Sequence, residues 1–110
     1  MEQLRQMALS LKLASAQRIL SVFLLGQSSF GEKALQDFLT QEVPLKRNAP
    51  AHSVEETANG REKALRAMAL EEWLKKAPSQ EEAKKRLAAL IPTLKDPWLK
   101  DFAQRKLQSL

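Results

Sequence analysis

The chain has 110 residues, with 18 Lys and Arg against 13 Asp and Glu, one His and no Cys. This length predicts one domain, residues 1–110, built around a single hydrophobic core. The absence of Cys excludes disulfides, thiolate nucleophiles and Cys-ligated metal clusters, and one His cannot build a multi-His metal site. We therefore expect a protein that is not an enzyme and that holds no cofactor and no metal.

The most apolar stretch of the sequence argues against a membrane span. Residues 13–25 are too few to cross a bilayer, and they include Gln17 and Arg18. The stretch is also a poor signal peptide, because its basic start is thin and includes Glu2, and no clear small-residue cleavage site follows it. We therefore expect a cytoplasmic protein.

Composition and charge patterning favour an all-α fold. Good helix formers such as Ala, Leu, Glu, Lys and Gln dominate, and no long segment alternates with the period of a strand. Residues 1–43 carry four basic and four acidic side chains, so the whole net charge of +5 lies in residues 44–110. The sequence predicts a compact bundle of about five helices, with a Pro-containing loop between the second and the third.

The first predicted helix covers residues 2–25 and ends at Gly26, a residue typical of helix C-termini. Its apolar side chains occupy nearly the whole circumference. A helix of this kind must be covered on nearly every side. It is either the central helix of the bundle or a helix covered in part by a second chain.

The second predicted helix begins with a capping box, Ser29 with Glu32, and ends near Glu42 before Pro44. Residues 43–52 contain two prolines and no periodicity, which predicts a loop. The loop divides an apolar helical pair, residues 1–42, from a charged helical part, residues 53–110. His52, the single histidine, is interpreted as an exposed loop residue, and the alternative is a general base or pH sensor.

The third predicted helix begins with a second capping box, Ser53 with Glu56, and ends before Pro78. The Asn59–Gly60 pair either ends a short helix there or is tolerated within a longer one. A helix-turn-helix with its turn at this pair is a weak interpretation, because the small residue expected four positions before the glycine is missing.

The last two predicted helices also have clear starts. A third capping box, Ser79 with Glu82, begins a helix that runs to about Ile91. Asp96 is the predicted N-cap of the final helix, and Pro97 occupies the first helical position, where proline is well tolerated.

The leading functional hypothesis rests on the first helix, because residues 19–25 are more apolar than one packing face requires. Exposed apolar surface of that kind marks protein–protein sites. Arg18 either extends its charge to solvent or pairs with a partner's carboxylate. We expect an adaptor, chaperone or regulatory subunit that binds another protein or itself. The predicted interface residues are Leu11, Arg18, Ile19, Val22, Phe23 and Leu25.

The alternative hypothesis is a nucleic-acid-binding regulator. Basic clusters in the last three helices could form a face that contacts phosphates. Against this, most of the clusters lie near acidic residues, and no Tyr is present for stacking on bases. The residues of this alternative are Lys75, Lys76, Lys84, Lys85 and Arg86.

Overall fold

A computed structural model describes residues 2–10, 15–28, 31–41, 45 and 48–110 of the chain. Within these residues the protein contains six α-helices, one short 3₁₀ helix and no strand, which confirms the predicted all-α bundle. The elements are α1 (Glu2–Leu9), α2 (Ser15–Gln27), α3 (Glu32–Thr40), α4 (Val54–Leu74), α5 (Gln80–Leu90), η1 (Ile91–Thr93) and α6 (Pro97–Ser109).

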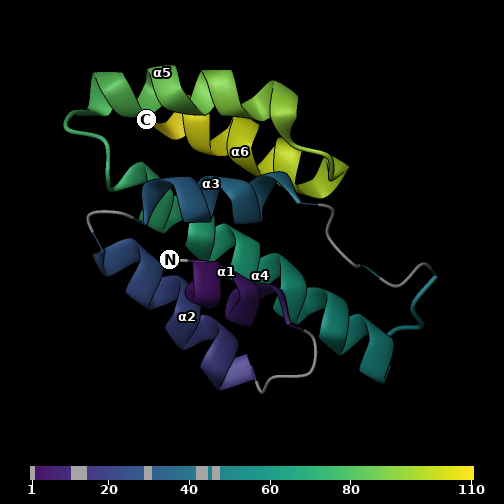
Figure 1. The fold of residues 1–110 in the computed structure, drawn as a ribbon. Helices are drawn as coiled ribbons and strands as arrows, with labels where there is room; N and C mark the ends of the chain where they lie inside the picture. Colours follow the sequence, from purple (N-terminus) through teal and green to yellow (C-terminus); the bar gives the residue numbers. More distant parts are fainter. Residues whose placement is uncertain (1, 11–14, 29–30, 42–44, 46–47) are drawn as a thin grey trace.

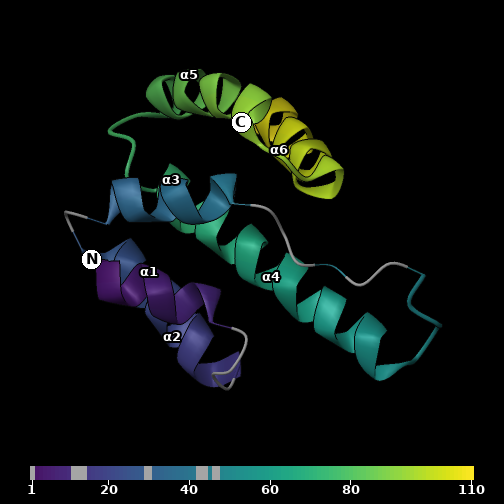
Figure 2. The same ribbon diagram turned by 45° about the vertical axis from the view of Figure 1, so that its right-hand side comes forward.

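The prediction of one long first helix is wrong, because two helices, α1 and α2, occupy this region. They pack against each other and run in opposite directions (Figure 2). A single helix that is apolar on all sides would need other elements to cover it all round, whereas two shorter helices cover each other. The Arg18 guanidinium adds a polar link, since its Nε donates a hydrogen bond to the carbonyl oxygen of Ala8 at 2.9 Å, near the end of α1.

The central helix of the bundle is α4. The predicted first helix, residues 2–25, does not have this position. With 21 residues α4 is about 30 Å long, which allows α2, α3 and α6 to pack along different parts of it. The α1–α2 pair lies on one side of the molecule and α5 and α6 lie on the other (Figure 1). The buried residues of α4 include three charged ones: Glu62, Leu65, Arg66, Ala69, Leu70, Glu72, Trp73 and Leu74.

Helix α4 passes through the Asn59–Gly60 pair without a break. A Cβ atom added at Gly60 would have no neighbour within 4 Å, so this glycine lies on the open side of the helix. The helix-turn-helix interpretation is therefore wrong, because it needs a turn at this pair. The cost of about 1 kcal/mol for an interior glycine is small beside the packing along the rest of the helix.

Local capping explains where three of the helices begin. The Ser53 hydroxyl accepts a hydrogen bond from the amide of Glu56 at 3.1 Å, and α5 begins in the same way, with the Ser79 hydroxyl and the Glu82 amide at 3.1 Å. The Asp96 carboxylate caps α6 through the amide of Leu99 at 2.9 Å. These three predicted helix starts are confirmed.

One capping box differs in detail from the prediction. The Glu56 carboxylate accepts a hydrogen bond from the amide of His52 at 2.6 Å, while the amide of Ser53 donates to the carbonyl of Pro50. Ser29, the predicted cap of the second helix, lies outside the described residues. In the structure Gly31 directly precedes α3.

Gly26 has a different role from the one its sequence position predicts. It lies inside α2, which continues to Gln27, and its φ angle is not positive. A Cβ atom at this position would lie 2.9 Å from the Cβ of Glu72, too close for ordinary packing. The glycine therefore permits a close approach between α2 and α4.

Candidate protein-interaction surface

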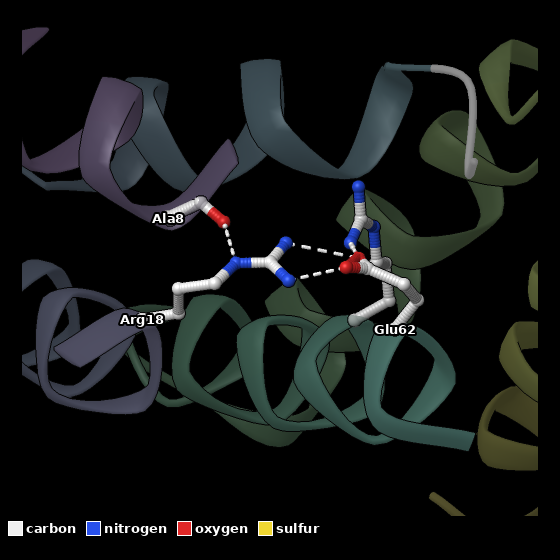
Figure 3. Close-up of polar contacts among 4 residues, drawn as sticks. Ala8, Arg18 and Glu62 are labelled. Carbon is white, nitrogen blue, oxygen red and sulfur yellow. Dashed lines mark hydrogen bonds and ion pairs between the residues drawn. The ribbon is translucent and has the colours of Figure 1, made fainter. Parts of the chain in front are cut away.

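Three charged side chains meet inside the protein, between α2 and α4. The Arg18 guanidinium binds both carboxylate oxygens of Glu62, with Nη2 donating to Oε2 at 2.9 Å (Figure 3). Arg66 donates to the same carboxylate from one turn further along α4, and its guanidinium lies 4.4 Å from the ring centroid of Phe38 on α3. The exposed fractions of Arg18, Glu62 and Arg66 are 7%, 4% and 1%. With the hydrogen bond to Ala8, this cluster links α1, α2, α3 and α4.

Burial and neighbouring charges shift the pKa values of Glu62 and Arg66 in this cluster. Burial raises the pKa of Glu62, but hydrogen bonds and charges from Arg18 and Arg66 outweigh burial, so this pKa lies below its ordinary value. Burial lowers the pKa of Arg66, and Glu62 partly restores it. Glu62 is therefore a carboxylate at neutral pH, held between two guanidinium groups.

The predictions for Arg18 placed its charge in solvent or on a partner protein, and the structure corrects both. Its charge is buried against Glu62, 44 residues away in the sequence. Sequence reasoning missed this pair because helical periodicity does not show which helices are neighbours. The cluster occupies the side of α2 that faces α4. A surface of α2 that a partner protein could contact therefore lies on the opposite side of the helix.

The outer side of α2 presents four large apolar residues to solvent. Their exposed fractions are 48% for Ile19, 54% for Leu20, 44% for Phe23 and 42% for Leu24. Residues at these spacings lie on one side of a helix. The other exposed side chains described on α2 are uncharged: Ala16, Gln17 and Gln27. We call Ile19, Leu20, Phe23 and Leu24 the α2 outer face.

The structure divides the predicted interface residues between surface and core. Ile19 and Phe23 belong to the α2 outer face, but Val22 and Leu25 are completely buried in the core of this chain, so they form no outer surface. Leu11 lies outside the described residues. Together with Arg18, the buried pair forms the inner stripe at positions i, i+4 and i+7, which faces α4.

The prediction missed Leu20 and Leu24 as surface residues. Both fall in the apolar stretch 19–25, and the helical period groups them with Ile19 and Phe23. That grouping could have been found from the sequence. Which of the two stripes packs on the chain's own core could not, because both stripes contain large apolar residues and the inner one also carries the charge of Arg18.

A groove lies beside the α2 outer face, between α2 and α4. The two helices run in the same direction: Arg18 near the start of α2 lies next to Glu62 in the first half of α4, and Gly26 lies next to Glu72 further along both helices (Figure 1). The groove has a volume of about 200 Å³, and most of its lining is apolar. Its lining residues are Arg18, Ile19, Arg61, Ala64, Leu65 and Met68.

Arg61 is the exposed charge of this groove. It forms no ion pair with any residue of the described part of the chain. Two turns earlier on the same side of α4 lies Val54, which is 82% exposed. An unpaired cation therefore lies in the groove that borders the α2 outer face, and Val54 extends the exposed apolar surface of α4 away from it.

The fold engages some of the basic residues of the nucleic-acid alternative and leaves the others exposed. Lys76 donates to the backbone carbonyls of Gly26, at 3.0 Å, and Ser28.

Lys75 pairs with Glu72 at 3.3 Å, and Arg86 pairs with Glu82 and, at 2.8 Å, with Glu32. Lys84 and Lys85 are exposed on α5. The five residues do not present one free cationic face, so their arrangement adds nothing to the nucleic-acid alternative.

Neither a metal centre nor a membrane helix is found in the parts of the chain that the structure describes. No three His, Asp or Glu side chains are grouped there so that they could hold a metal ion, and none of the helices is long and apolar enough to span a bilayer. Comparisons with protein-family models, with curated proteins and with solved structures found no match for this chain.

Proposed function

We propose that this chain is a small non-enzymatic interaction module, an adaptor, chaperone or regulatory subunit of the cytoplasm, that binds another protein through the α2 outer face. The observation that supports the proposal is the group of four adjacent apolar side chains, each 42–54% exposed, with no charged residue among the described exposed side chains of α2. Contiguous apolar surface costs solvation free energy when left in water, and its burial against a partner recovers that free energy.

The mechanism is burial of helix against helix. Phe23 and Leu20 are the expected anchors, because large side chains near the centre of a patch supply most of the binding free energy at interfaces. Val22 and Leu25 attach the opposite side of α2 to the core. This separation of inner and outer stripes allows the outer one to be changed without loss of core packing.

The test is site-specific photo-crosslinking in the cells that make the protein. A benzophenone amino acid replaces Leu20 on the α2 outer face, and in a matched control it replaces Gln104, an exposed residue of α6. We expect a discrete adduct of higher mass from position 20 and none from position 104. Adding Phe23→Asp to the first variant should abolish the adduct while its circular dichroism spectrum stays unchanged.

Two results would contradict the proposal. One is the absence of any discrete adduct from position 20, and the other is an adduct that persists unchanged with Phe23→Asp in a folded protein. Light scattering on a sizing column, over a range of protein concentrations, then determines whether the partner is a second copy of the chain.

A further inference from the structure

We propose that the partner's docking segment is an amphipathic helix with a carboxylate beside its apolar stripe, and that this helix lies along the groove between α2 and α4 and pairs with Arg61. The inference rests on the proposed function and names the chemistry of its partner. It follows from the shape of the groove and from the distribution of charge around it.

The shape of the groove suits a helix. Two helices that run side by side in one direction leave a furrow, into which the side-chain ridge of a third helix packs. Ile19 forms one wall of this furrow, and Leu65 and Met68 lie on the other. Ala64 lines the groove and is exposed, and its short side chain leaves room for a larger one from a partner.

The charge around the groove selects the partner. Arg61 is exposed and unpaired within the described residues, and the described exposed side chains of α2 carry no charge. The adjacent Glu62 points into the buried cluster and is occupied by Arg18 and Arg66. A guanidinium pairs well with a carboxylate, and complementary charge at an interface rim favours the matching partner over others.

A second copy of the chain fits this surface less well. Its own α2 outer face would bring no carboxylate from the described residues of α2, and its own Arg61 would add a like charge near the interface. The net charge of +5 on each copy opposes association further. A helix with acidic residues at its flank supplies both the apolar contact and the missing countercharge.

The experiment is selection from a phage-displayed library of amphipathic helices about five turns long. Every member carries a fixed Leu stripe, and the positions that flank the stripe are drawn from Glu, Lys, Gln and Ser. The targets are the unchanged protein, Arg61→Glu, and Lys85→Glu, a control with the same charge change on exposed α5. Phe23→Asp is a fourth target and tests whether selection depends on the α2 outer face.

We expect helices selected on the unchanged protein and on Lys85→Glu to carry Glu over Lys at one flank by about fivefold, the effect of one exposed ion pair. Selection on Arg61→Glu should reverse this preference, and Phe23→Asp should select no helices. The inference is overturned if no helix is selected, if the selected flanks show no preference for Glu, or if Arg61→Glu leaves the preference unchanged.

Two other occupants of the groove would also overturn the inference. One is a dimer seen by light scattering that Phe23→Asp dissociates, and the other is binding to vesicles of phosphatidylcholine and phosphatidylglycerol that Phe23→Asp abolishes. A photo-adduct at position 20 together with selected helices of no charge preference would leave the proposed function standing while refuting the acidic partner. Absence of the adduct refutes the proposed function itself.

Discussion

The substitution Glu62→Gln tests the energetics of the buried charge cluster. Glutamine keeps the size of the side chain but removes the charge that neutralises Arg18 and Arg66, which are 7% and 1% exposed. Removing one partner of a buried ion pair costs about 3–5 kcal/mol, because it leaves uncompensated charge in the interior. The glutamine oxygen still accepts a hydrogen bond, so we expect the lower end, about 3 kcal/mol.

The measurement is urea unfolding followed by circular dichroism. Small proteins have m-values of about 1–3 kcal/mol per molar urea, so this loss lowers the midpoint by about 1–3 M. A typical domain is stable by only about 5–15 kcal/mol, and the loss is therefore a large part of the total.

The matched control is Asp101→Asn, which breaks an Arg–carboxylate pair on the surface. Asp101 and Arg105 are paired one turn apart on α6, with side chains 53% and 74% exposed. Exposed pairs contribute about 0–1 kcal/mol, so the control should lose no more than that. A loss in Glu62→Gln as small as in the control would refute the reasoning, since the cluster would then contribute no more than a surface pair.

The same substitution has a defined pH dependence. The pKa of Glu62 is lower in the folded chain than in the unfolded one, so its contribution to stability is fully present above about pH 4.3. That contribution is lost as the pH falls through the folded pKa, because the protonated acid then resembles glutamine. The difference in unfolding free energy between the unchanged protein and Glu62→Gln should therefore shrink on acidification. A constant difference at all pH values would contradict the assigned charge state.

Three further tests address other parts of the structure. Gly60→Ala should raise the free energy of unfolding by about 0.5–1 kcal/mol, since the site is helical with open space around it, and a lower thermal midpoint would argue against a continuous α4. Lys76→Met removes two hydrogen bonds to the end of α2 and should lower the free energy of unfolding in urea by about 1–3 kcal/mol. The control Lys75→Met changes a 70% exposed side chain and should cost under about 0.5 kcal/mol. Equal losses in the two variants would show that Lys76 does not fasten α2 to α4. Val22→Asp buries a charge and should unfold the protein by circular dichroism, while Phe23→Asp should leave it folded; similar behaviour would contradict the assigned orientation of α2.

Local sequence determined the helical class of this protein and several of its helix starts. Ser53, Ser79 and Asp96 cap helices through amides three residues away, so the interaction is complete within one short segment. The apolar character of residues 19–25 likewise predicted that this helix has more apolar surface than packing on one side requires. These features depend on neighbours in the sequence, and a reading of the sequence can therefore find them.

Tertiary structure alone decided which elements are central and which side of α2 is exposed. The Arg18–Glu62 pair joins residues 44 positions apart, and nothing in either local pattern predicts that they meet. Both stripes of α2 contain large apolar residues, so periodicity separates Val22 from Phe23 but does not tell which one is buried. That choice depends on the summed packing of α1, α3 and α4 against one stripe, together with the ion pair that orients it. Which stripe of α2 is buried therefore depends on several helices at once, and the sequence of α2 alone does not reveal it.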